Sequence, residues 1–204
     1  MKDFEKLFWI VEATHELRKN RGGYVAASTL FSGAKDSLKI LAPYRPTLLG
    51  GFAIGVYAEP RATQDLDLTI LPEDLNPALD ALMQEGFHQK GVTDFKGVIL
   101  YHLERSGFKL DLLQFQSKTF QQGLITRAQP NSLFDENISV ISPEDLIATK
   151  LLSFRSKDKI DIISLLETKE LPLDLGQIKT STQDLKIFDR YSFVEEHLPE
   201  FRKG

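Results

Sequence analysis

The sequence predicts an α+β fold, in which a small mixed β-sheet is flanked by helices and followed by a helical C-terminal region. Two segments predict the sheet, because apolar and polar residues alternate along Asp65–Ile70 and Phe108–Phe115, as they do in strands that bury one face. The C-terminal helices begin at Ser142 and Pro143, residue types favoured at the N-cap and the first position of a helix. With 204 residues, 42% of them hydrophobic, the chain is long enough to bury a substantial core.

Residues 1–45 are predicted to be a helical segment that packs on the core. Apolar residues recur at helical spacing over Asp3–Asn20. Gly22-Gly23 breaks this pattern, and a second helix is expected over about Ala34–Leu41.

Residues 46–142 are predicted to form the core. Its expected elements are a short strand, a helix, the Asp65 strand, a second helix, an antiparallel pair of strands and a short edge strand. In that order they cover Pro46–Leu49, Phe52–Ala58, Asp65–Ile70, Pro72–Glu85, Val98–Leu103 with Phe108–Phe115, and Ile138–Ile141. Arg105-Ser106-Gly107 separates the paired strands and is typical of a hairpin turn.

Residues 143–204 are predicted to be mainly helical. The first helix has two acids in its first turn, where negative charge is favourable. Its Lys150 falls on or beside the buried stripe, so the ammonium either reaches solvent or meets anions in a cleft, and we favour the cleft. A second helix is expected over Lys159–Leu166, followed by a connector at Leu171-Pro172-Leu173.

Three aspartates are the candidate catalytic and metal-binding residues. Side chains two apart in a strand share a face, so Asp65 and Asp67 are expected to project together. Asp111 lies on the face of its own strand opposite Phe108 and Leu110, and it converges with the pair if the two strands are neighbours. Carboxylates this close repel one another unless one of them is protonated or a cation lies between them. A hard divalent ion is the simplest remedy, and Mg²⁺ or Mn²⁺ prefers such oxygen ligands.

Gly50 and Gly51 stand where the first core strand gives way to a helix. Bare amides at such a turn can bind phosphate, because a helix N-terminus carries free N–H groups and partial positive charge. Taken alone, Gly-Gly is more simply a tight turn, and Asp-x-Asp is more often structural. The combination of both with Asp111 favours a phosphate and metal site.

These residues resemble the nucleotidyltransferase superfamily with a DNA polymerase β-like core, whose pattern is Gly-Gly or Gly-Ser, a helix, Asp-x-Asp and a third Asp. The stretch Gly50–Ile70 is most similar to the branch of minimal nucleotidyltransferases and abortive-infection toxins. Gly51 departs from the better-characterised transferases, which carry Ser there. That departure removes a hydroxyl that can hold a phosphate, so the choice of nucleotide stays open.

A second block strengthens the resemblance. Ser142–Leu152 is similar to the helical block that follows the core in that branch, and so are the charged residues after it, Arg155, Lys157, Asp158 and Asp161. The matching segments span about Thr47–Leu166, over half of the chain.

The resemblance implies metal-dependent transfer of a nucleoside monophosphate from a nucleoside triphosphate to an acceptor hydroxyl. The acceptor can be an RNA 3′ end, a protein or a small molecule, and the toxin branch implies an antitoxin as partner. The implied metal ligands are Asp65, Asp67 and Asp111, with Mg²⁺ or Mn²⁺ as cofactor. The implied nucleotide-binding residues are Gly50, Gly51, Arg61, Thr63 and Lys150.

Plainer alternatives remain open at this point. The chain could be a non-catalytic nucleotide- or metal-binding module that retains the fold. Arg61 could pair with Glu59 on the surface. Between Lys150 and Lys159 four cations face one acid, and a solvated helix face explains this run as readily as a phosphate or RNA contact does.

Composition excludes several other classes. The absence of cysteine removes disulfides, zinc–thiolate sites and cysteine nucleophiles. The histidines show no metal-ligand spacing and are interpreted as structural or surface residues: His15, His88, His102 and His197. There is no P-loop or dinucleotide-binding glycine pattern. A net charge of −4 argues against a surface devoted to duplex nucleic acid. The early apolar run Leu7–Val11 is too short for a signal or a membrane span, so we expect a soluble, cytoplasmic protein without membrane contact.

Overall fold

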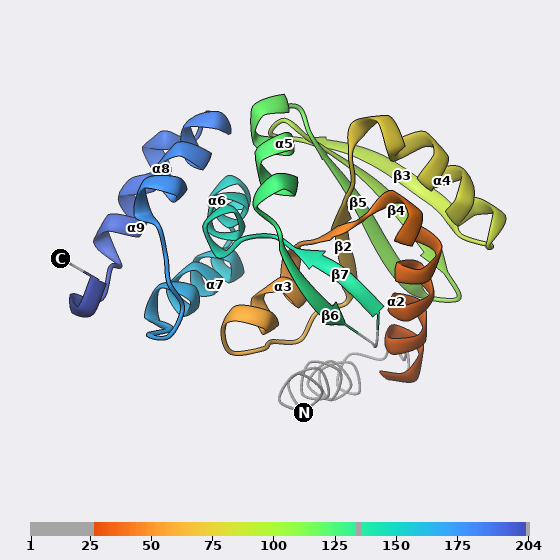
Figure 1. Cartoon of the computed structure of the whole chain (residues 1–204), viewed down its shortest axis with the longest axis horizontal. Helices are drawn as coiled ribbons and strands as arrows, with labels where there is room; N and C mark the ends of the chain where they lie inside the picture. The colour runs from red at the N-terminus through yellow and green to blue at the C-terminus, as the bar shows by residue number, and fades with distance from the viewer. Residues whose placement is uncertain (1–26, 134–135, 203–204) are drawn as a thin grey trace.

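The computed structural model describes residues 27–133 and 136–202, which form a mixed seven-stranded sheet surrounded by helices (Figure 1). The strands lie in the order β3-β4-β5-β2-β1-β7-β6. In chain order they are β1 (Thr47–Leu48), β2 (Asp65–Thr69), β3 (His88–Phe95), β4 (Val98–Arg105), β5 (Phe108–Phe115), β6 (Gln129–Leu133) and β7 (Glu136–Val140). β2 is parallel to β5 and β1 is parallel to β7, whereas the other neighbours are antiparallel.

Helices cover the sheet and extend beyond it. The described α-helices are α2 (Ala27–Leu41), α3 (Gly50–Tyr57), α4 (Leu75–Gln84), α5 (Lys118–Arg127), α6 (Pro143–Ser153), α7 (Ser156–Glu167), α8 (Leu175–Asp184) and α9 (Ser192–Glu196). α6 to α9 lie together on the left in Figure 1, and α2 and α4 lie on the right near the β3–β4 hairpin. α3 contacts β2 on one side and α6 and α7 on the other, so it joins the sheet to the C-terminal helices.

Strand β5 shows how the sheet is anchored. Its residues Phe108, Leu110 and Leu112 are buried, and α2 packs on this strand so closely that a Cβ atom at Gly33 would overlap the ring of Phe108. In the parallel register with β2, Leu66 lies beside Leu110. The leucine faces of both strands are therefore in the core, and the residues between them point to the opposite face.

Most elements predicted for the core and the C-terminal region are confirmed. The hairpin of β4 and β5, the strand at Asp65 and the helix that begins at Pro143 lie where their patterns indicate. The helix predicted from Ala34 already includes Ala27, the first of the described residues. The helix predicted over Asp3–Asn20 and the break at Gly22-Gly23 lie outside the described residues, and the division of the chain into three regions stays a prediction.

In the predicted core, one strand was misplaced, and two strands and one α-helix had no prediction. The segment expected to be a short edge strand is β7, which lies between β1 and β6 and is therefore internal. β3 escaped prediction because it is an exposed edge strand without apolar alternation, and β6 contains Pro130, which argues against a strand. α5 has few apolar residues and contains Gly123. Among the described residues, no helix has both the length and the apolar character needed to cross a bilayer.

Candidate active site

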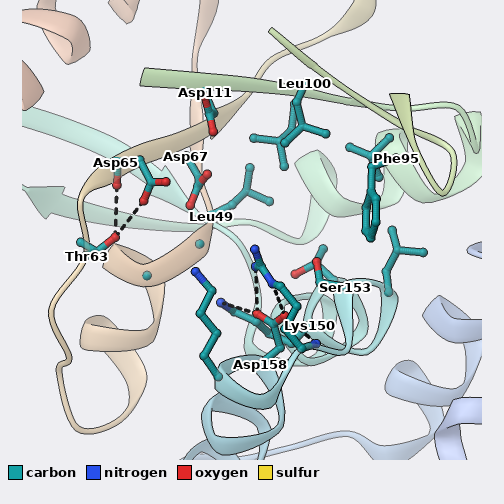
Figure 2. Close-up of a pocket in the computed structure, with 18 of the residues that line it drawn as sticks. Leu49, Thr63, Asp65, Asp67, Phe95, Leu100, Asp111, Lys150, Ser153 and Asp158 are labelled. Carbon is teal, nitrogen blue, oxygen red and sulfur yellow. Dashed lines mark hydrogen bonds and ion pairs between the residues drawn. The ribbon is translucent and has the colours of Figure 1, made fainter. Parts of the chain in front are cut away.

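Three carboxylates converge on the face of the sheet opposite its leucines. Asp65 and Asp67 are two apart on β2, and Asp67 lies directly beside Asp111 of β5 in the parallel register. Each of the three side chains is partly buried and offers an oxygen that lies within 4.8 Å of the others. The convergence expected from the two strand patterns is therefore present, as Figure 2 shows.

Burial and mutual repulsion disturb the ionisation of this cluster. Burial raises the pKa of Asp67 to about 7, and the charges of Asp65 and Asp111 add to the effect. Burial also raises the pKa of Asp111, although a hydrogen bond from His102 opposes the shift. Three clustered oxygen donors of this kind fit a hard divalent cation such as Mg²⁺ or Mn²⁺, which would relieve the repulsion.

Two features of the structure require glycine at position 50: its backbone conformation and the side chain of Asp67. It begins α3 with a φ of +65°, a conformation that favours glycine. A Cβ atom there would overlap the carboxylate of Asp67. The same residue therefore starts the helix and makes room for the aspartate, which places Asp67 at the helix N-terminus, where N–H groups lack helical partners.

Gly51 is also confined, by the side chain of Thr63. A Cβ atom at Gly51 would lie 2.7 Å from Oγ1 of Thr63, so this threonine fills the space that a serine at position 51 would need. Thr63 Oγ1 donates to the Oδ1 of Asp65 over 3.2 Å. The hydroxyl of Thr63, from the loop before β2, thus lies close to where the side chain of a serine at position 51 would begin.

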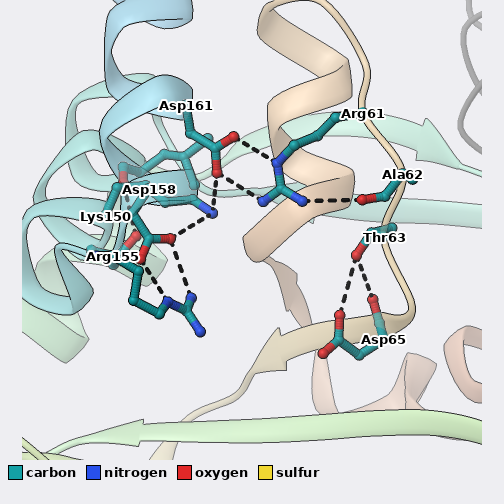
Figure 3. A network of polar contacts seen from close by, with 10 residues as sticks. Arg61, Ala62, Thr63, Asp65, Lys150, Arg155, Asp158 and Asp161 are labelled. Atoms are coloured by element: carbon teal, nitrogen blue, oxygen red, sulfur yellow. Dashed lines mark hydrogen bonds and ion pairs between the residues drawn. The ribbon is translucent and has the colours of Figure 1, made fainter. Parts of the chain in front are cut away.

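Opposite the carboxylates, cations and acids form one network (Figure 3). Arg61 makes a two-pronged contact with Asp161 at 2.6 and 2.8 Å. Lys150 lies 2.7 Å from Asp161 and 3.6 Å from Asp158, and Arg155 also pairs with Asp158. Burial alone would raise the pKa of either aspartate, but the hydrogen bonds and cations hold both values below normal.

This network decides two alternatives left open by the sequence. Arg61 pairs with Asp161 and not with Glu59. Lys150 is only 6% exposed, so the solvated helix face is wrong for this residue. Its ammonium meets anions, as expected, and these anions are Asp158 and Asp161 of α7.

Two further residues of the cavity were not predicted from the sequence to belong to the site. Lys157 lines the same cavity, and among the described residues it has no ion pair or hydrogen bond, unlike Arg61, Lys150 and Arg155. His102, interpreted from the sequence as an ordinary structural or surface residue, lies 2.8 Å from Asp111. The hairpin turn could have indicated that His102 lies next to Asp111. A two-residue turn between Arg105 and Phe108 sets the register in which these two residues are paired.

Apart from Asp161, these groups line one cavity of about 380 Å³. Figure 2 shows the carboxylates along one side, Lys150 and Asp158 across from them, and Phe95 and Leu100 at one end. The apolar end is completed by other side chains of the hairpin and of α6, among them Val98, Leu113, Phe115 and Leu152. The cavity therefore combines a charged part with an apolar part, as sites for nucleotides and drug-sized ligands commonly do.

The fold is one that nucleotidyltransferases have. The chain is similar to the antibiotic-resistance factor ANT(2'')-Ia in its solution structure, with a TM-score of 0.53 and 14% identity over 83% of this chain and 97% of that one. It is also similar to the crystal structure of ANT(2'')-Ia in complex with adenylyl-2''-tobramycin, with a TM-score of 0.50 and 15% identity over 83% and 99% of the two chains. At this identity the likeness shows the fold alone.

The family match is more specific. Residues 43–180 match the AbiEii family, described as the nucleotidyl transferase AbiEii toxin of a type IV toxin–antitoxin system. The match covers more than half of the chain, which therefore belongs to this family of nucleotidyltransferases. None of the curated proteins compared with the chain matches it.

Proposed function

We propose that the protein transfers a nucleoside monophosphate from a nucleoside triphosphate to an acceptor hydroxyl and releases pyrophosphate, as the toxin of a toxin–antitoxin pair. The observation that carries this proposal is the convergence of Asp65, Asp67 and Asp111 beside the Gly50 turn in one cavity. Family membership supports the reaction class.

The charged part of the cavity suits a triphosphate. Asp65, Asp67 and Asp111 would hold one or two divalent ions, which when bound would neutralise charge on the phosphate oxygens. The amides at Gly50-Gly51 point from a helix N-terminus, where anions are favoured. Lys157 adds a cation without an ion pair among the described residues.

The transfer step needs positioning more than a protein nucleophile. The acceptor oxygen forms a bond to the α-phosphorus while its proton passes to the carboxylate of Asp111. The bond from that phosphorus to the bridging oxygen of the β-phosphate breaks, and pyrophosphate leaves with the electron pair. Asp111 lines the cavity, and among the described residues its Oδ2 has no hydrogen-bond donor, so this carboxylate is available on the acceptor side.

The acceptor is the open part of the proposal. An RNA 3′ end, a protein hydroxyl and a small molecule all suit the same chemistry, because the fold does not determine the substrate. ANT(2'')-Ia is named in complex with an adenylylated tobramycin, whereas the family is named as toxins. We favour a macromolecular acceptor because the family describes toxins, and we expect a cognate antitoxin as partner.

The test combines labelled substrates with conservative variants. Each of the four α-³²P-labelled nucleoside triphosphates is incubated with the protein, Mg²⁺ or Mn²⁺, and total RNA or lysate, and the labelled product is then identified. We expect Asp65→Asn and Asp67→Asn to lower transfer by about 100-fold or more, which corresponds to about 2.7 kcal/mol of transition-state stabilisation. Asp80→Asn, an exposed residue of α4 outside the cavity, is the matched control.

Two results would contradict the proposal. The first is transfer that survives in both Asp65→Asn and Asp67→Asn at the level of the control. The second is nucleotide or Mn²⁺ binding without any labelled product, which would favour the non-catalytic binding module.

A further inference from the structure

His102 and Asp111 form a cross-strand pair beside the carboxylate cluster. They lie directly opposite each other on β4 and β5, and Nδ1 of His102 is 2.8 Å from Oδ1 of Asp111. An ionised carboxylate can only accept a hydrogen bond, so Nδ1 carries the proton and donates. Oδ2 of Asp111 has no donor among the described residues, and the side chain lines the cavity.

The second ring nitrogen of His102 is also held. Nε2 lies 2.9 Å from Oγ1 of Thr93 on β3. In the neutral ring Nε2 is an acceptor when Nδ1 is protonated, so the hydroxyl of Thr93 donates to it. Three neighbouring strands thus supply one chain of hydrogen bonds, from Thr93 through His102 to Asp111, and the chain fixes both the orientation and the tautomer of the ring.

This series of hydrogen bonds orients the carboxylate of Asp111 and not those of Asp65 and Asp67. Asp65 and Asp67 are held by β2, by the Gly50 turn and by Thr63, and none of these groups orients the carboxylate of Asp111. Rotation about the Cβ–Cγ bond of Asp111 would exchange its two oxygens, and the hydrogen bond from His102 opposes that rotation. Hydrogen-bond partners of this kind orient metal-ligating groups, and their removal typically costs 10- to 100-fold in metal affinity or activity.

We propose that His102, held in place by Thr93, is a positioning residue that fixes Asp111 for the acceptor side of the reaction. The proposal rests on the proposed function, because it assumes that Asp111 acts at the reacting atoms. It assigns His102 no contact with nucleotide. Loss of the imidazole should therefore slow turnover while the affinity for the nucleoside triphosphate changes little.

The first test separates the role of the Nδ1 donor from the role of the ring. His102→Leu removes both hydrogen bonds, whereas the amide of His102→Asn can place an N–H close to the position of Nδ1. Thr93→Val keeps the shape of the side chain and removes the donor to Nε2. His88→Leu on the neighbouring strand and Thr126→Val on α5 are matched controls, because both residues are exposed and lie outside the cavity.

We expect His102→Leu to lower kcat by about 10- to 100-fold and to leave KM for the nucleoside triphosphate within about twofold. His102→Asn should recover most of the loss, and Thr93→Val should lie between His102→Leu and the wild-type protein. Mn²⁺ binding to the protein without nucleotide, followed by electron paramagnetic resonance, should weaken in His102→Leu and not in His88→Leu.

The second test observes the hydrogen bond without any turnover. Long-range ¹H–¹⁵N spectra at pH 8 distinguish the two neutral tautomers of histidine. His102 should carry its proton on Nδ1 in the wild-type protein and on Nε2 in Asp111→Ala. His197 is an internal reference, because its Nδ1 lies 2.8 Å from the carbonyl oxygen of Phe193 and should keep its proton in both proteins.

The outcomes separate the two proposals. If Asp65→Asn and Asp67→Asn are inactive while His102→Leu behaves like His88→Leu, the positioning role is overturned and the proposed function stands. An equal loss in His102→Asn and His102→Leu would also overturn it, because the donor would not be what matters. If the aspartate variants stay active, the proposed function fails and this inference fails with it. If His102→Leu does not fold, Thr93→Val, His102→Asn and the tautomer spectra decide.

Discussion

Asp67 carries an unusual ionisation that predicts how stability depends on pH. Its pKa is raised to about 7 by burial and by the charges of Asp65 and Asp111, whereas an unfolded aspartate titrates near about 3.9. The folded protein therefore keeps a proton that the unfolded chain loses. The resulting stabilisation is fully present below pH of about 4 and is lost as the pH rises through about 7.

The measurement is urea unfolding in EDTA at pH 5 and pH 8. We expect the metal-free protein to be less stable at pH 8, and Asp67→Asn to reduce the difference, because the amide cannot ionise. The lowered pKa values of Asp158 and Asp161 act with the opposite sign and only in more acidic solution. A wild-type protein that is more stable at pH 8 than at pH 5 would contradict the prediction.

Gly50 gives a second prediction for a single residue. Gly50→Ala places a methyl group in the left-handed region and against the carboxylate of Asp67. We expect a loss of about 1–3 kcal/mol in the free energy of unfolding, together with a loss of transfer activity. Gly91→Ala is the control, because nothing lies within 4 Å of a Cβ atom there. Equal stability of the two variants, measured by urea unfolding, would show that the Gly50 turn can relax.

Replacing Lys157 should affect nucleotide binding alone, whereas replacing Lys150 should also affect stability. Lys157 lines the cavity and has no ion pair among the described residues, so Lys157→Met should weaken nucleotide binding by about ten- to hundredfold, as expected for a lost charge-assisted contact. The free energy of unfolding of the Lys157→Met variant should equal that of the wild-type protein. Lys150→Met leaves buried Asp161 and Asp158 with fewer partners, so it should lower stability as well.

Calorimetric titration with a non-hydrolysable nucleoside triphosphate and Mg²⁺, combined with urea unfolding, measures both effects. Lys118→Met on α5, exposed and outside the cavity, is the control. Nucleotide affinity unchanged in Lys157→Met would place the phosphates elsewhere in the cavity.

At the scale of single elements, α6 offers a paired test. Ser142 caps α6 by accepting from the N–H of Asp145, and Ser117 caps α5 by accepting from the N–H of Phe120. Each serine-to-alanine change should cost about 0.5–2 kcal/mol. α6 carries cavity residues and α5 carries none, so thermal melts should fall in both variants while activity falls further in Ser142→Ala. Equal activity in the two variants would show that α6 keeps its place without the cap.

The elements that the sequence predicts best are those with a one-sided pattern or a strong start signal. β2, β5 and α6 are of this kind, because leucine alternation and the Ser142-Pro143 start depend on local sequence. β3 has no such signal, because every residue in it except Gly91 is exposed. Its pairing comes from the turn at Lys96 and Gly97, both with positive φ, and not from its own composition.

At the scale of the whole molecule, the three predicted aspartates do lie together, whereas the contacts of the residues around them were not predicted. Convergence of Asp65, Asp67 and Asp111 follows once β2 and β5 are neighbours, and the two patterns suggested that arrangement. The partners of Arg61 and Lys150 did not follow, because Asp158 and Asp161 approach them only through the packing of α7 against α3 and α6. Long-range packing of this kind leaves no periodic trace in the sequence.

The network of Figure 3 has a consequence for the order in which ligands enter. Four cations, Arg61, Lys150, Arg155 and Lys157, line the cavity together with four acids, Asp65, Asp67, Asp111 and Asp158, and Asp161 pairs with Arg61 and Lys150 from outside the lining. Three of these cations are already paired with Asp158 or Asp161, which leaves Lys157 as the cation of the lining without an ion pair among the described residues. If the cavity takes a nucleoside triphosphate as we propose, this one cation faces the carboxylates of Asp65, Asp67 and Asp111, so we expect the nucleotide to bind as its complex with Mg²⁺ or Mn²⁺ and not as the bare anion.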